Sequence, residues 1–151
     1  MPEMQLIVAS GGEQLDHIRE IARDASNITV LGWVNDDELV DLVSNALATI
    51  YIPSEEDFGM SPVESMAAGK PVIGVAEGGL LETVVHNQTG ILLRSNPSAH
   101  DIIKAVQSMT KERAYSMRFA CEQRATLFSK QRFIENMNAI IGACINSADR
   151  D

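Results

Sequence analysis

The stretch PSEEDFGMSPVESMAAGKPVIG, residues 53–74, sets both the fold and the candidate site of this 151-residue chain. Ser61, Pro62 and Glu64 are typical of a helix start, with Ser61 at the N-cap, Pro62 at the first helical position and Glu64 at the third. The spacing therefore predicts a helix over 61–68. An apolar strand at 71–75 follows it directly, so this stretch predicts a loop, a short helix and a buried strand in close succession.

The same alternation continues in both directions along the chain. Apolar strand patterns occur at 4–10, 28–32, 47–52, 71–75 and 90–94. Helical patterns occur between them at 13–25, after a cap at Asn35 or Asp36, at 61–68 and at 80–85, and three helices follow Ser98. This order predicts the α/β class, a Rossmann-like parallel sheet flanked by helices with a helical C-terminal tail. Such sheets bind ligands at the carboxyl ends of their strands, where the loop after 47–52 lies.

Composition limits the classes of function. The length fits one domain over 1–147, with a frayed end at 148–151. No apolar run reaches the ~20 residues of a membrane-spanning helix, and the start shows no signal peptide, so we expect a cytoplasmic protein.

Cys121 and Cys144 are expected to be reduced core residues, and no metal-ligand spacing is present. The net charge of −9 disfavours a nucleic-acid partner.

Two interpretations of the glutamates remain open from the residues alone. Glu64 can complete a capping box with Ser61, and Glu56 can belong to a solvated acidic loop. Alternatively, the unpaired N–H groups of the helix start form an anion site that Gly59 lets a ligand approach closely. Glu56 would then accept hydrogen bonds from sugar hydroxyls and Glu64 from a ribose diol.

Further short motifs accompany the two glutamates. They are Val30-Leu31-Gly32-Trp33-Val34, Asp37-Glu38-Leu39, Pro53-Ser54, Phe58-Gly59, Met66-Ala67-Ala68-Gly69, Pro71-Val72-Ile73, Gly78-Gly79, Thr89-Gly90 and Phe128-Ser129. With Glu56 and Glu64 at the spacing Glu-x7-Glu, they resemble the family-4 retaining glycosyltransferases of the GT-B fold. The resemblance covers nearly the whole chain and identifies it with the C-terminal, donor-binding half of that fold.

The resemblance implies a role for each residue of the candidate site. Glu56 would be the catalytic residue that contacts the donor hexose, and Glu64 would hold the ribose hydroxyls. The remaining donor-binding residues would be Phe58, Gly59, Met60 and Ser61 toward hexose and phosphate, and Trp33 and Val34 toward the nucleobase. Trp33 either packs in the core, as a Trp after a strand usually does, or stacks on the base.

The implied function is transfer of a hexose, with retention, from a nucleotide sugar to a glycan or lipid-linked acceptor. The motifs look most like O-antigen-type mannosyltransferases, which suggests GDP-mannose as donor, with no cofactor and no metal. The full-length enzyme would be cytoplasmic and peripheral at the membrane. A sugar-nucleotide epimerase of the same fold and a non-enzymatic flavodoxin-like interaction module are the alternatives.

The resemblance also predicts what this chain lacks. The acceptor domain and the opening strand–helix unit, which carries an Arg and a Lys toward the diphosphate, are expected outside it. Lys70 would lie at the far end of the helix from the phosphate. We therefore expect weak donor binding and no turnover by this chain alone. The apolar stripe Phe133, Met137, Ile140, Ile141 and Cys144 on the last helix predicts self-association or a rearranged C-terminal helix.

Overall fold

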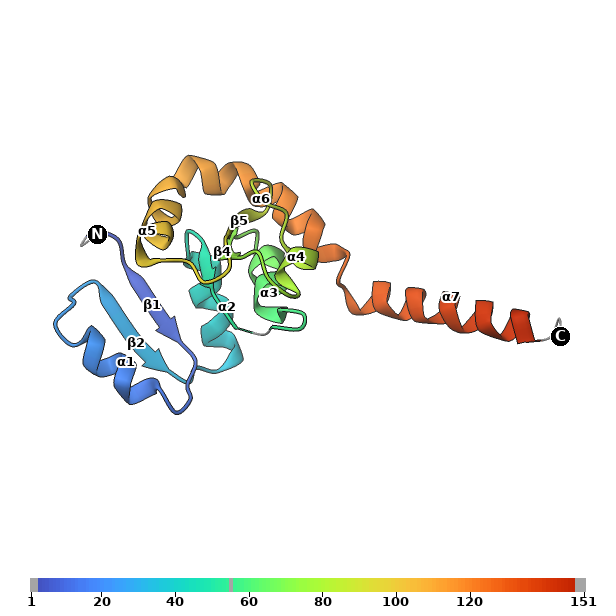
Figure 1. The fold of residues 1–151 in the computed structure, drawn as a ribbon, viewed down its shortest axis with the longest axis horizontal. Helices are drawn as coiled ribbons and strands as arrows, with labels where there is room; N and C mark the ends of the chain where they lie inside the picture. Colours follow the sequence, from blue (N-terminus) through green and yellow to red (C-terminus); the bar gives the residue numbers. More distant parts are fainter. Residues whose placement is uncertain (1–2, 55, 149–151) are drawn as a thin grey trace. The chain divides into compact units, whose positions relative to one another are not determined.

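The computed structural model describes residues 3–54 and 56–148, which divide after Leu42 into two compact units (Figure 1). The first unit contains β1 (Leu6–Ala9), α1 (Leu15–Ala22) and β2 (Ile28–Gly32). Its two strands pair in parallel, from Leu6 opposite Ile28 to Ala9 opposite Gly32, and α1 lies against β2. The first unit is thus a small parallel strand–helix–strand assembly.

The helix α2 (Asp36–Asn45) runs across the boundary between the units. The Asn35 side chain accepts a hydrogen bond from the Glu38 N–H, and the Glu38 carboxylate accepts one from the Asn35 N–H, both at 2.9 Å. These reciprocal bonds satisfy two backbone donors that the first turn of a helix leaves unpaired. The cap expected at Asn35 or Asp36 is therefore at Asn35.

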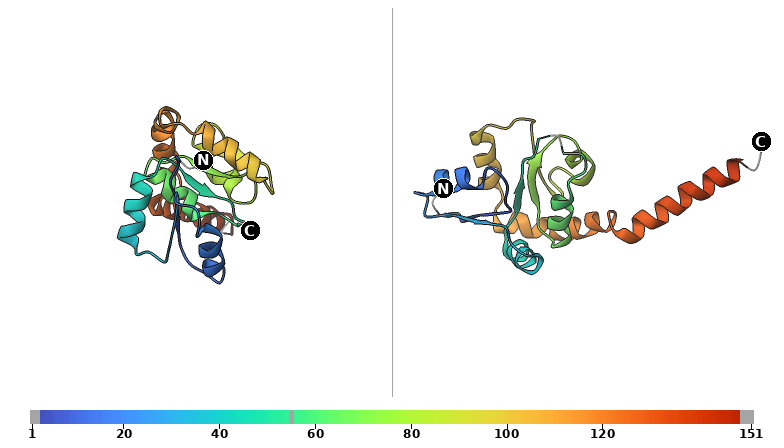
Figure 2. Two further views of the ribbon diagram at one scale, coloured as in Figure 1. Left: turned by 90° about the vertical axis from the view of Figure 1, so that its left-hand side faces the viewer. Right: turned by 90° about the horizontal axis from the view of Figure 1, so that it is seen from below.

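The second unit is built on a parallel sheet of β3 (Thr49–Tyr51), β4 (Val72–Val75) and β5 (Gly90–Leu93), in that order (Figure 2). Every residue of β4 is buried because this strand is central and covered on both faces, which explains its unbroken apolar sequence. The helix α3 (Met60–Ala67) lies against β3 and β4. The expected α/β class with a parallel sheet is confirmed.

The helices α4 (Leu80–Thr83), α5 (Ala99–Ser108), α6 (Lys111–Thr126) and α7 (Lys130–Ala148) complete the second unit. The α5 helix packs on β5 and α6 packs on α3. Ser98 caps α5, as the sequence predicts. Of the frayed end expected at 148–151, Ala148 is instead the last residue of α7, and 149–151 lie outside the described residues.

The core of the second unit joins α3, β4 and α6. Its fully buried side chains include Met66, Val72 and Cys121. Burial raises the pKa of the Cys121 thiol to about 11, because a thiolate there would lose its hydration. The expectation that both cysteines are core residues holds for Cys121 and is wrong for Cys144, which is exposed on α7.

The apolar stripe of α7 is exposed. Phe133 exposes 63 % of its surface and Ile140 exposes 58 %, and Met137, Ile141 and Ile145 are also exposed. Nevertheless, within the described ranges no helix combines the length and the apolar character that a membrane span needs.

Candidate functional site

The N-cap of the helix α3 lies two residues earlier than the sequence predicts. Its N-cap is Gly59, with φ of 83°, and no side chain caps it. Ser61 therefore occupies the second helical position and Pro62 the third, so the expected capping box of Ser61 and Glu64 is wrong. Gly59 takes the N-cap because it adopts a positive φ without the steric cost of a Cβ. Pro62 has no backbone N–H, and it is tolerated here because the backbone N–H groups in the first turn of a helix have no partner within the helix in any case.

The Glu56 carboxylate is fixed through both of its oxygens. Oε2 accepts a hydrogen bond from the Tyr51 hydroxyl at 2.5 Å, and Oε1 accepts one from the Gly59 N–H at 2.9 Å and a longer one from the Phe58 N–H at 3.4 Å. These bonds, that of Tyr51 first, lower the pKa of Glu56. The same contact raises the pKa of Tyr51 to about 12. At neutral pH the pair is thus a carboxylate and a neutral phenol.

A pair of glycines after β4 lets two loops pack directly against each other. The Gly79 N–H donates to the Glu56 carbonyl oxygen at 3.0 Å. A Cβ atom at Gly78 would overlap that carbonyl oxygen, and one at Gly79 would overlap the backbone of Phe58. The loop that carries Glu56 follows β3, and the glycines follow the adjacent strand β4. The site therefore lies where two neighbouring parallel strands end, as expected for this class of sheet.

The Phe58 ring is held by the end of α6. It meets the ring of Phe128 edge-on, with centroids 5.6 Å apart, and the Arg124 guanidinium lies 5.2 Å from the centroid of Phe128. Arg124 also donates hydrogen bonds to the carbonyl oxygens of Thr83, at 3.0 Å, and Glu82 at the end of α4. Phe58 thus packs on Phe128 just after α6, and Arg124 connects Phe128 to the end of α4.

In the structure, most of the expected donor-binding residues lie together around the first turn of α3. Glu56, Phe58, Gly59, Met60 and Ser61 surround the start of α3, where the N–H groups of Met60 and Ser61 make no hydrogen bond to the described residues. Glu64 lies one turn further along α3 and its side chain is exposed. Its position leaves it accessible to a ligand rather than engaged as a cap.

Trp33 and Val34 belong to the first unit, whereas Glu56 and Glu64 belong to the second. Trp33 exposes 79 % of its surface, so the expectation that it packs in the core is wrong. Its indole lies so close to Gly11 that a Cβ at Gly11 would overlap the ring. An exposed aromatic ring over a glycine can offer a face to a planar ligand.

Sequence reasoning missed Tyr51 and Arg124, and it noted Phe128 only as part of a motif and not as a neighbour of the site. Tyr51 ends an apolar strand, where a ring is expected for packing, and its hydroxyl finds Glu56 only because the loop turns back. A signal was nevertheless available, since Tyr51 precedes the loop with Glu56 at the carboxyl end of its strand. Within the described part of the chain, no cluster of three or more His, Cys, Asp or Glu side chains could hold a metal ion.

Comparison with known proteins assigns the chain to a class. Residues 1–127 match the family described as glycosyl transferases group 1. The chain therefore belongs to the group 1 glycosyltransferases.

Two curated relatives are mannosyltransferases. The chain is 33 % identical over 153 residues to alpha-1,3/1,6-mannosyltransferase ALG2 of Dictyostelium discoideum, covering 92 % of this chain and 36 % of that protein. It is 36 % identical over 100 residues to a GDP-mannose-dependent alpha-(1-6)-phosphatidylinositol monomannoside mannosyltransferase of Mycobacterium tuberculosis, covering 58 % of this chain and 26 % of that protein. The chain thus spans about a third of the length of such relatives.

A solved structure supports the fold. Sucrose-phosphate synthase from Thermosynechococcus elongatus superposes with a TM-score of 0.81 at 22 % identity, over 95 % of this chain and 39 % of that one. The expected fold, the C-terminal half of a GT-B glycosyltransferase, is confirmed.

Proposed function

We propose that this chain is the donor-binding domain of a retaining hexosyltransferase that transfers mannose from GDP-mannose to a glycan or lipid-linked acceptor. The observation that carries the proposal is the Glu56 carboxylate, fixed at the start of α3 beside the N–H groups of Met60 and Ser61. A carboxylate and free N–H groups in one place suit a ligand that carries both hydroxyls and phosphate. The two mannosyltransferases among the relatives support mannose as the hexose.

Each site residue then has a role in this proposal. Glu56 contacts the hexose and stabilises charge as the glycosidic bond breaks. The backbone from Phe58 to Ser61 receives hexose hydroxyls and phosphate, with Gly59 allowing close approach and Met60 exposed beside it. Glu64 binds the ribose hydroxyls, and Trp33 and Val34 are the proposed contacts of the nucleobase. The nucleotide sugar is a substrate, and the proposal includes no cofactor or metal.

Weak binding by this chain alone follows from its charges. The net charge is −9, and among the described residues no Arg or Lys forms an ion pair or hydrogen bond with residues 56–61. Charge-assisted hydrogen bonds to Arg and Lys are the strong contacts of a diphosphate. In this proposal, the cations come from the opening strand–helix unit of the donor domain and the acceptor site comes from the acceptor domain.

Two finer proposals concern partners and location. We propose that the exposed stripe of α7 mediates self-association. We also propose a cytoplasmic location with peripheral contact to a membrane, because a lipid-linked acceptor would be presented there.

Nucleotide titrations monitored by NMR test the donor site, since NMR detects weak binding. GDP, GDP-mannose, UDP-glucose and ADP-glucose are added separately to the chain. We expect GDP-mannose and GDP to shift the amide signals of Gly59, Met60 and Ser61. Glu64→Ala weakens the binding of both ligands about tenfold, because losing a hydrogen bond that a ribose hydroxyl donates to a charged carboxylate costs about that much.

The matched control is Glu112→Ala, an exposed glutamate in the first turn of α6, which leaves both affinities unchanged. If no nucleotide or nucleotide sugar shifts these amides, the donor-site proposal is wrong. Binding of UDP-glucose or ADP-glucose alone would retain the site and overturn GDP-mannose as its donor.

A further inference from the structure

We propose that Tyr51 is a positioning residue for Glu56, whose carboxylate it holds in one orientation for the donor hexose. This inference rests on the proposed function, because it assigns the orientation of the residue that would contact the sugar. Nothing in the short motifs of the sequence points to Tyr51, and its role follows from the contacts of its hydroxyl.

Tyr51 is itself rigidly placed. It is the last residue of β3, paired with Gly74 of β4, and its ring packs against the core cluster of the second unit. The phenol oxygen at the end of the ring reaches Glu56 Oε2 at 2.5 Å. The hydroxyl is therefore placed by the sheet and the core rather than by the loop that carries Glu56.

Tyr51 and the start of α3 together determine how the carboxylate is turned. Tyr51 binds Oε2, and the N–H groups of Gly59 and Phe58 bind Oε1. The terminal torsion of a glutamate is otherwise broad, so two partners on different oxygens are needed to fix it. A carboxylate has about four acceptor positions, and these three bonds leave one on Oε2 for a hydroxyl of the ligand.

No other side chain among the described residues shares this task. No charged side chain there is hydrogen-bonded to Glu56, and Tyr51 is the titratable group that acts on its pKa. The backbone of Glu56 is fixed separately, by the Gly79 N–H on its carbonyl oxygen. Loss of the Tyr51 hydroxyl would thus free the carboxylate while its backbone stayed in place.

A different pair of side chains ties β3 to α3. The Thr49 hydroxyl donates to the Ser65 hydroxyl at 2.8 Å, and Ser65 donates to the Lys70 carbonyl oxygen at 3.1 Å. This link holds the strand against the helix two residues before Tyr51. The Tyr51 hydroxyl is therefore not required for that packing, and Tyr51→Phe isolates its effect on Glu56.

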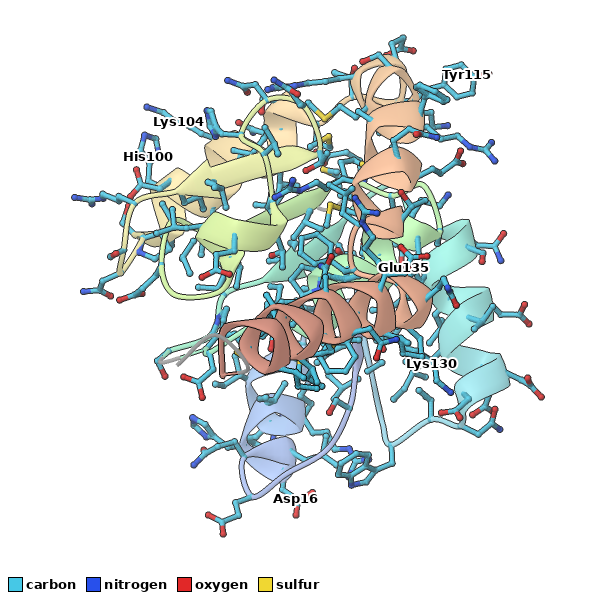
Figure 3. The ribbon with its side chains drawn as sticks, turned by 90° about the vertical axis from the view of Figure 1, so that its right-hand side faces the viewer. Asp16, His100, Lys104, Tyr115, Lys130 and Glu135 are labelled. Carbon is cyan, nitrogen blue, oxygen red and sulfur yellow. The ribbon has the colours of Figure 1, made fainter. Side chains whose placement is uncertain are left out.

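The test compares GDP-mannose with GDP by calorimetric or NMR titration of the wild-type chain and Tyr51→Phe. We expect the variant to bind GDP-mannose about tenfold more weakly and GDP with unchanged affinity, since the misdirected carboxylate meets only the sugar. The matched control is Tyr115→Phe, which removes the same hydroxyl from an exposed ring pointing outward from α6 (Figure 3). It should change neither affinity.

A spectroscopic measurement accompanies the titrations. The carboxyl carbon of Glu56, assigned by its loss in Glu56→Gln, is followed by ¹³C NMR as the pH falls from neutrality. Its midpoint lies below the ordinary value of 4.5 in the wild type. We expect Tyr51→Phe to move the midpoint upward and Tyr115→Phe to leave it in place. A purely structural role for Tyr51 would not produce this shift together with selective loss of the sugar nucleotide.

The outcomes separate the two proposals. Equal affinities of wild type and Tyr51→Phe for GDP-mannose, or equal losses for GDP-mannose and GDP, overturn the positioning role and leave the donor site standing. Failure of the wild-type chain to bind either ligand overturns the proposed function, and the positioning role with it.

Discussion

Gly78 shows how a residue without a side chain helps determine where the loop of Glu56 lies. Its φ is 49°, in the left-handed region, and a Cβ there would overlap the carbonyl oxygen of Glu56. The obstacle is backbone, which cannot rotate away as a flexible side chain can. The position of the Glu56 loop thus depends on the absence of one carbon atom on the neighbouring loop.

We predict that Gly78→Ala lowers the free energy of unfolding by about 2 kcal/mol, from the strained φ and the displaced loop. Urea unfolding measures this change. The control is Gly142→Ala on α7, where a Cβ meets nothing within 4 Å. That substitution should stabilise the helix by about 0.5–1 kcal/mol. If the two variants had equal free energies of unfolding, the prediction would be contradicted, because the loops could then separate at no cost in stability.

The sequence allowed part of the site to be predicted at the residue scale. Glu56 and Gly59 were expected from the motif, and both lie together at the start of α3. The position of the N-cap was wrong because Ser61 and Glu64 form a common capping signature, while the positive φ of Gly59 cannot be seen in a sequence. Tyr51 was missed because its contact depends on how the loop returns to its strand, which spacing along the chain does not specify.

The start of α5 shows how capping bonds are coupled to protonation. Asp101 accepts hydrogen bonds from the Ser98 hydroxyl at 2.7 Å and the Ser98 N–H at 2.9 Å, and Arg94 lies 3.1 Å away. These contacts, that of the Ser98 hydroxyl first, lower the pKa of Asp101 to about 2. Because this pKa is lower in the folded protein, the contribution is complete above the unfolded value of 3.8 and is lost as the pH falls toward 2.

We therefore predict that Ser98→Ala destabilises the protein by about 1 kcal/mol at pH 7, the usual cost of losing an N-cap serine. The difference from wild type should shrink between pH 4 and pH 2, roughly the interval between the two pKa values. Thermal unfolding followed by circular dichroism at several pH values measures both effects. Ser116→Ala, in the middle of α6, is the control and should show no such pH dependence. A constant difference across this interval would contradict the coupling.

At the scale of elements the sequence was informative for order and type. The unbroken apolar run of β4 predicted a buried strand, and two helix starts were predicted at Ser98 and at Asn35 or Asp36. The alternation of strands and helices is a local property, so it survives in the pattern. The division of the chain after Leu42 was not predicted, because it depends on contacts between distant segments.

The whole molecule presents an exposed apolar stripe along α7. Phe133, Met137, Ile140 and Ile141 recur at helical spacing and are exposed. A stripe of this kind loses contact with water when two copies pair, which favours association by about 25 cal/mol for each Å² buried. The proposed self-association is therefore a property that depends on protein concentration.

We predict that the average mass, measured by light scattering after size-exclusion chromatography, rises with protein concentration. Ile140→Asn should reduce this rise, because it removes an exposed apolar side chain from the stripe. Ala139→Asn, on the same helix, is the control for the lower helix propensity of Asn and should have a smaller effect. A mass that stays monomeric at all concentrations would contradict self-association through α7.

The contrast between the two cysteines has a practical consequence for chemical labelling. A maleimide reacts with a thiolate that it can reach, and Cys121 is buried with a thiol pKa of about 11. Cys144 is exposed on α7. At neutral pH a dye would thus attach to α7 and leave the core intact. The native chain already carries a selective attachment point for fluorescence measurements on its last helix.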